Sequence, residues 1–261
     1  MPFIEYGSIK YYHCTSLENQ GLYHAFFTRH GGFSPVPWRS LNFGASVGDD
    51  IQRVVRNREI ALACLNIKPE SVYDVFQIHS TDVVSTERPL AASEEHLKAD
   101  AIHTNQPGIT LMMRFADCVP ILLFDPVKRA IAIIHAGWIG TVGNILQKTV
   151  LAFIENYNSR PEDIIAAIGP SIGPDHYSVG WDVIKQVYTS FKTYSDQVIR
   201  KENEKYYFNL WKANQILLSE LGLIKIEMTE ICTSCNLNDW YSHRGEKGTT
   251  GRFGVVIGLS E

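Results

Sequence analysis

A cysteine and a histidine stand at the open end of one predicted β-hairpin. Two apolar runs, 119–125 and 130–134, are separated by a polar turn that contains a proline, a pattern typical of paired strands. If the two residues that flank the turn pair with each other, Cys118 lies opposite Gly137. His135 then shares a face with Cys118, because side chains alternate along a strand. Such diagonal neighbours have backbones about 7–8 Å apart, and a register slip of one residue would separate them.

His79 is the third candidate, because it follows an apolar stretch, Val72–Ile78, that we expect to be a strand. His79, Cys118 and His135 allow two kinds of chemistry. In the first, they bind Zn²⁺ as three protein ligands and leave a fourth position for a water, whose pKa the ion lowers to about 7. In the second, Cys118 is a thiolate nucleophile and a histidine is its base. The three residues are not a compact motif, so their spacing alone does not decide between the two.

The composition predicts a soluble cytoplasmic protein. The 261 residues are 45% hydrophobic, so the chain can bury one large core. The net charge is −4, and no basic patch indicates nucleic acid as a partner. No apolar run approaches the ~18 residues of a membrane helix, and the N-terminus lacks the pattern of a secretory signal. Five cysteines, an odd number, argue against a disulfide framework. We expect a monomer or a homodimer.

The order of the expected elements favours an α+β fold with mixed sheets over a doubly wound parallel sheet, because strands come in clusters and helices come between them. Helices are expected at about 50–64, from a capping Thr141 to about Tyr157, and at Trp181–Phe191 and Leu210–Leu221. Besides the hairpin, strands are expected at Ala25–Thr28, Val72–Ile78, Ile109–Arg114, Ile164–Ile168, Ile224–Ile231 and Gly251–Ile257.

Other residues offer weaker signals. Asp117 could orient a ligand histidine or merely cap the turn, and strand alternation points it away from Cys118. Cys232 and Cys235 form a C-x-x-C pair, but without a second such pair or a His-x₃₋₅-His the incidental interpretation is favoured over a redox or zinc site. Candidate contacts to phosphate or ribose are four arginines: Arg29, Arg58, Arg244 and Arg252.

Eight motifs occur in order along the chain. They are Phe27–Ser34 (FTRHGGFS), Leu41–Gly44 (LNFG), Gln77–His79 (QIH), Ala99–Ala101 (ADA), Ala116–Pro120 (ADCVP), His135–Trp138 (HAGW), Ile168–Gly173 (IGPSIG) and Thr250–Arg252 (TGR). Together they resemble the laccase-domain (YfiH-like) family, once labelled polyphenol oxidase, from about residue 23 to 257. The resemblance implies one catalytic domain over residues 1–261, with layered helices around central mixed β-sheets. It also implies a zinc site, with His79, Cys118 and His135 as ligands, copper as a possible occupant, and Asn42 among the substrate-binding residues.

The activity that the resemblance implies is purine nucleoside phosphorolysis. Adenosine, inosine, guanosine or S-methyl-5′-thioadenosine would react with phosphate to give the base and (thio)ribose 1-phosphate, and adenosine deamination is implied at the same zinc site. The alternative is a cysteine or zinc hydrolase that removes a wrong amino acid from a peptidoglycan precursor; a third hypothesis is a non-enzymatic protein with a structural metal. Ile139 departs from the Arg or Lys of many relatives. True laccase chemistry is excluded, because the nine histidines include no His-x-His pair.

Overall fold

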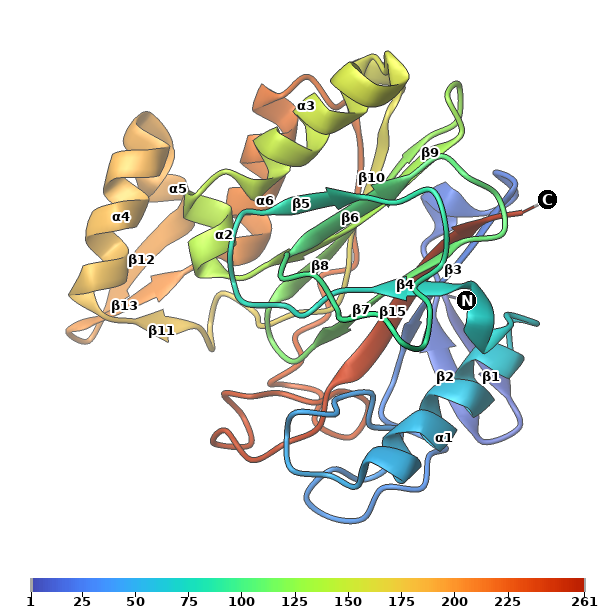
Figure 1. Ribbon diagram of the computed structural model, residues 1–261. Coiled ribbons are helices and arrows are strands. Elements are labelled where there is room, and N and C mark those ends of the chain that lie inside the picture. Colours follow the sequence, from blue (N-terminus) through green and yellow to red (C-terminus); the bar gives the residue numbers. More distant parts are fainter. Residues whose placement is uncertain (1, 261) are drawn as a thin grey trace.

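Two six-stranded sheets lie face to face between layers of helices in the computed structural model, which describes residues 2–260 (Figure 1). Residues 1 and 261, the ends of the expected domain, lie outside the described part. The first sheet has the order β1 (Phe3–Tyr6), β2 (Ile9–Tyr12), β3 (Leu22–Phe27), β15 (Phe253–Leu259), β7 (Thr110–Phe115), β4 (Val72–Asp74). The second has the order β14 (Lys225–Met228), β10 (Ile165–Ile168), β8 (Val119–Asp125), β9 (Ala130–Ala136), β6 (Ala101–Thr104), β5 (Val83–Ser85). The expected α+β class with mixed sheets is confirmed.

The remaining elements form the outer layers and a small third sheet. The helices are α1 (Ile51–Ala63), α2 (Trp138–Val142), α3 (Ile145–Tyr157), α4 (Trp181–Phe191), α5 (Ser195–Val198) and α6 (Leu210–Glu220). The third sheet has the order β11 (Ser178–Val179), β13 (Lys205–Phe208), β12 (Ile199–Glu202). Short 3₁₀ turns span Thr15–Leu17, Pro69–Ser71, Pro161–Asp163 and Lys192–Tyr194. Across residues 2–260, no helix is both long enough and apolar enough to cross a membrane.

The hairpin β8–β9 lies at the centre of the second sheet and is buried on both faces. Leu122 and Phe124 pack in the core between the two sheets, whereas Ile121 and Leu123 pack in the core beneath the helices. Burial on both faces explains why these strands are continuous apolar runs rather than alternating ones.

Helices cover the outer face of each sheet (Figure 1). On the first sheet, Leu62 of α1 shares a core with Phe27 and Met112. Asp50 caps α1 by accepting hydrogen bonds from the backbone N–H groups of residues 52 and 53. On the second sheet, apolar side chains of α3 such as Phe153 pack against the hairpin together with α6.

Several expected boundaries are wrong. The strand expected at Val72–Ile78 ends at Asp74, since the chain there leaves the first sheet for β5 in the second. The strand expected at Ile224–Ile231 is confined to Lys225–Met228. Thr141 lies inside α2 instead of capping a long helix, because Asn144 takes a left-handed φ of 63° and separates α2 from α3.

The topology brings many loops to one end of the sandwich. β4 is parallel to β7, and β5 is parallel to β6, so both crossings from the first sheet to the second, β4–β5 and β7–β8, lie at the same end. β9, β10 and β14 finish there, as their pairing with β8 and with each other requires. β15 begins there, because Phe253 pairs with Phe115 at the end of β7. The loops at this end carry most of the motifs noted in the sequence.

We predict that Leu122→Ala destabilises the fold, because it opens a cavity between the two sheets. The free energy of unfolding should fall by about 2–5 kcal/mol, measured by urea denaturation. Leu151→Ala on α3, where the leucine is 44% exposed, is the matched control and should change it by less than about 0.5 kcal/mol. Equal effects of the two substitutions would contradict the assignment of Leu122 to the inter-sheet core.

Candidate metal centre

His79, Cys118 and His135 meet at the loop-rich end of the sandwich. The register inferred from the sequence is confirmed: Asp125 pairs with Ala130, which places Cys118 opposite Gly137. His79 arrives from the β4–β5 crossing, Cys118 from the β7–β8 crossing directly before β8, and His135 from β9. One ligand atom from each of the three lies within 4.8 Å of the others. Cys118 Sγ is 3.7 Å from His79 Nε2.

Residue 137 must lack a side chain for this cluster to form. A Cβ on Gly137 would lie 3.0 Å from Cys118 Sγ and 3.2 Å from His79 Cδ2. The glycine therefore leaves room for the sulfur and the imidazole to approach each other across the end of the hairpin.

Asp100 is the carboxylate that orients the cluster, a role the sequence analysis considered only for Asp117. Its buried side chain accepts a hydrogen bond from His135 Nδ1 at 2.7 Å and from the backbone N–H groups of Ile78, His79 and Ser80 at 3.2, 3.0 and 2.5 Å. The bond at Nδ1 leaves Nε2 of His135 for a ligand. The only sequence signal was the position of Asp100 in the Ala-Asp-Ala motif directly before β6.

Asp117 instead fixes the turn that carries Cys118. Its backbone has a left-handed φ of 83°. Its Oδ1 accepts a hydrogen bond from Thr233 Oγ1 at 2.6 Å, and its Oδ2 accepts one from the backbone N–H of Arg244 at 2.6 Å. The alternative in which Asp117 stabilises the turn is therefore the one that the structure favours.

The electrostatics favour a thiolate beside an imidazolium. Burial opposes charge on Cys118, but His135 and His79 outweigh it and lower the pKa of this thiol to about 6. Burial likewise opposes charge on His135, yet the Cys118 sulfur and the Asp100 carboxylate raise the pKa of this imidazole to about 9. Deprotonated thiol is the form that binds metals and attacks carbon.

The three donors fit a transition-metal ion. Zinc takes imidazole nitrogen and thiolate sulfur at about 2.0 and 2.3 Å, which in a tetrahedron places the two ligand atoms about 3.5 Å apart. The 3.7 Å between Cys118 Sγ and His79 Nε2 matches this separation. Two imidazoles and one thiolate also suit copper, so the donor set does not distinguish the two ions.

Two of the expected substrate-binding residues, Arg252 and Arg244, interact with the turn that carries Cys118. Arg252 precedes β15 at the same end of the sandwich, and the charges of Cys118 and Asp117 act on its guanidinium, although burial lowers its pKa overall. Arg244 Nη1 donates to Ser178 O at 2.9 Å.

The other three residues make contacts within the protein. Arg29 donates to Leu237 O at 2.8 Å and pairs with Glu246. Asn42 accepts hydrogen bonds from the backbone N–H groups of Gly44 and Arg252. Arg58 donates to Phe43 O. Their role in substrate binding stays a prediction.

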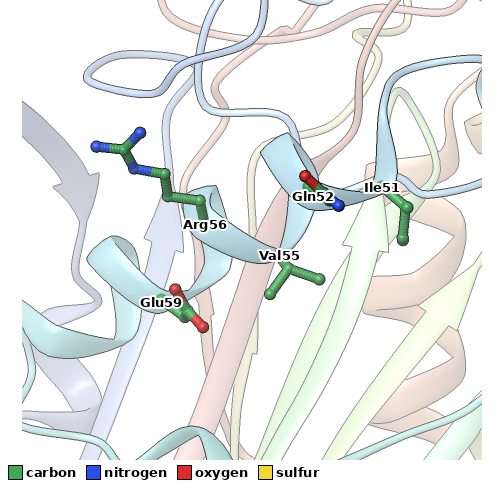
Figure 2. Close-up of a pocket in the computed structure, with 5 residues that line it drawn as sticks. All are labelled: Ile51, Gln52, Val55, Arg56 and Glu59. Carbon is green, nitrogen blue, oxygen red and sulfur yellow. The ribbon is translucent and has the colours of Figure 1, made fainter.

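Two hollows on the surface do not contain the cluster. One runs along the outer face of α1, where Ile51 and Val55 point to the same side of the helix (Figure 2), and none of the expected site residues lines it. The other is bordered by Ser80, directly after His79, and by Ile139. Ile139 is 42% exposed, so its side chain faces a hollow beside the His79 loop.

Comparison with known proteins places this arrangement in a family. The sequence model of the family described as "Multi-copper polyphenol oxidoreductase laccase" matches residues 23–260. The chain belongs to this laccase-domain (YfiH-like) family. It is 35% identical to purine nucleoside phosphorylase YlmD of Bacillus subtilis over 258 residues, 95% of this chain and 92% of the relative. It is 36% identical to a purine nucleoside phosphorylase of Deinococcus radiodurans over 241 residues, 92% of this chain and 90% of the relative. The crystal structure of the Bacillus licheniformis hypothetical protein YfiH superposes with a TM-score of 0.92 at 33% identity, over 99% of both chains.

The residues of this laccase-domain protein do not fit a multicopper oxidase, which needs many histidine ligands. Between residues 2 and 260, two groups of at least three side chains are able to hold a metal. One consists of His79, Cys118 and His135, and the other contains a single histidine, His176. The family description therefore does not transfer copper oxidase chemistry to this chain.

Asp100→Asn should weaken zinc binding by about 10–100-fold, because the amide no longer provides the charge that supports His135. Competition with a chelator measures this affinity. The matched control is Asp125→Asn at the other end of the hairpin, where the buried carboxylate accepts hydrogen bonds from the backbone N–H groups of Val127 and Lys128. Zinc affinity should not change there; an equal loss in both variants would mean that Asp100 acts only through stability.

Cys118 should react with iodoacetamide at neutral pH in protein stripped of metal. Its lowered pKa keeps it a thiolate at pH 7, and the labelling rate should fall as the pH drops through about 6. Cys64 is an internal control: it is also half-buried, but desolvation raises its pKa, so it should be labelled only in alkaline solution. Peptide mass spectrometry after timed labelling measures both, and parallel pH profiles would contradict the assignment.

Proposed function

We propose that this protein is a zinc-dependent purine nucleoside phosphorylase whose site is formed by His79, Cys118 and His135. The observation that carries the proposal is the meeting of these three donors at one point, in a chain about 35% identical to proteins named purine nucleoside phosphorylase. The substrates would be adenosine, inosine, guanosine or S-methyl-5′-thioadenosine with phosphate, and the products the base and (thio)ribose 1-phosphate.

The chain's own residues would hold the ion and the phosphate. His79, Cys118 and His135 supply three ligands and leave a position for a non-protein ligand, which is the arrangement of catalytic rather than structural zinc sites. A zinc ion bound there supplies a Lewis acid that polarises a ligand and lowers the pKa of water. Asp100 keeps the His135 ring oriented through the bond at Nδ1.

Arg252 is the arginine best placed to hold phosphate. Its guanidinium donates to the carbonyls of Thr250 and Gly251 through Nη1. These contacts orient the guanidinium and do not use Nε or Nη2. A guanidinium binds phosphate through two parallel N–H groups. Cleavage of the bond between base and ribose needs phosphate on the side opposite the leaving purine, and a positive group beside the cluster would position it there.

Adenosine deaminase activity at the same site is the second part of the proposal. Zinc deaminases replace the amine of the base with oxygen from water and hold their ion with three histidine and cysteine ligands, as here, but with one histidine or none where this cluster has two. This reaction consumes no phosphate, so the two activities are separable in one incubation.

Incubation of nucleosides with zinc-loaded protein tests both parts. Free base and ribose 1-phosphate should form only when phosphate is present, whereas adenosine should give inosine and ammonia without it. Cys118→Ala should lower the rate of base release by more than about 100-fold. Loss of a residue that only supports a metal ligand already lowers metal affinity or activity by about 10–100-fold. Cys64→Ala is the matched control and should retain activity. Wild-type base release by Cys118→Ala would overturn the proposal.

One observation favours a second candidate, a cysteine hydrolase that removes a wrong amino acid from a peptidoglycan precursor. Cys118, His135 and Asp100 form a chain of thiol, imidazole and carboxylate, which is the order of nucleophile, base and orienting group in cysteine hydrolases. Amide hydrolysis that persists after complete chelation of metal, and that iodoacetamide abolishes, would favour this candidate over the phosphorylase.

A further inference from the structure

A second group of metal-binding side chains lies at the same end of the sandwich. It consists of Asp175, His176, Cys232 and Cys235, and one ligand atom from each lies within 4.8 Å of the others. We call these four residues the second cluster. The C-x-x-C pair considered incidental in the sequence analysis therefore does have partners, contributed by the loop after β10.

The distances within the second cluster suit a tetrahedral ion. His176 Nδ1 is 3.5 Å from Cys235 Sγ and 3.9 Å from Cys232 Sγ. A zinc ion brings sulfur and nitrogen ligands about 3.5 Å apart. Asp175 Oδ1 is 3.0 Å from the same nitrogen, close enough to be the fourth ligand.

The backbone around Cys232 converges on its sulfur. The backbone N–H groups of Gly173 and Cys235 donate to Cys232 Sγ at 3.2 and 3.4 Å. A Cβ on Gly173 would lie 3.1 Å from this sulfur and 2.8 Å from Asp175 Oδ1, so a glycine is needed where the loop passes the cluster.

We propose that the second cluster binds a divalent zinc-type ion with Cys232, Cys235, His176 and Asp175 as its four ligands. Four protein ligands close the coordination shell, so the site is structural rather than catalytic. Each ion bound displaces the two thiol protons, which pass to solvent. Cys235 and Asp175 are exposed, so the ion can enter from solvent.

The ion would fasten together two loops that hold the catalytic turn. Thr233, between the two cysteines, donates to Asp117 Oδ1, and the backbone N–H of Ile172 donates to Asp117 O at 3.0 Å. Asp117 directly precedes Cys118. The structural ion therefore stabilises the loops that position the Cys118 turn, without contacting His79, Cys118 or His135.

Metal analysis of the full-length chain tests the proposal. Protein purified with a thiol reductant, loaded with excess Zn²⁺ and desalted should hold two zinc ions per chain. Cys118→Ala and Cys235→Ser should each hold one, and the double variant none. Cys64→Ser is the matched control for a thiol outside both clusters and should hold two. The zinc lost in Cys235→Ser is counted against wild type whether or not His79, Cys118 and His135 bind an ion. The two sites are therefore judged separately.

Substitution of His176 and Co²⁺ loading provide independent readouts. His176→Ala should also lose one zinc, whereas His243→Ala, at an exposed histidine outside both clusters, should lose none. In the Cys118→Ala background, added Co²⁺ should give a sulfur-to-metal absorption band and raise the melting temperature, and both effects should vanish with Cys235→Ser. Equal zinc content in wild type and Cys235→Ser, or a Cys232–Cys235 disulfide in the reduced preparation, would overturn the proposal.

Discussion

The buried carboxylate of Asp100 is the interaction on which the first metal cluster depends. It joins the two sheets, because it accepts hydrogen bonds both from the loop that carries His79 and from the His135 ring on the hairpin. The backbone of His79 is left-handed, with a φ of 59°, a conformation that costs a residue with a side chain about 1–2 kcal/mol. The three backbone N–H bonds to Asp100 offset this cost. The Asp100 carboxylate has no exposed surface, and it is tolerated there because its oxygens accept hydrogen bonds from three backbone N–H groups and the His135 ring.

The stacking of two sheets explains why the functional residues gather at one end. Each crossing of the chain from the first sheet to the second delivers a residue of the cluster: His79 on the β4–β5 crossing and Cys118 on the β7–β8 crossing. The hairpin then returns His135 to the same end, and β15 begins there just after Arg252. The strands supply a rigid frame, and the loops supply most of the chemistry.

The parts of this arrangement that depend on local patterns could be predicted from the sequence. The hairpin register followed from two apolar runs and one turn, and the helix expected at Trp181–Phe191 has the bounds of α4. What could not be predicted depends on contacts between distant segments. Nothing near Asp100 or Asp117 in sequence distinguishes the carboxylate that holds His135, since the two residues have similar neighbours. Likewise, His176 and Cys232 are 56 positions apart in the sequence, and the pairing of β10 with β14, continued by the bridge between Ser171 and Cys232, brings them together.

The placement of His135 on a fully buried hairpin, and of His79 and Cys118 on the loops that cross between the sheets, affects how such a protein can diverge. A substitution in β8 or β9 changes core packing and metal geometry together, so few are tolerated. Loop residues that hold none of the ligands in place are free of that double constraint, and they can be exchanged one at a time while the reactive centre stays intact. Ile139 stands at this boundary, since it is the first strongly exposed residue after His135 and borders a hollow next to the His79 loop. New substrate preferences within this fold would therefore be expected to arise at such positions, with the chemistry inherited unchanged.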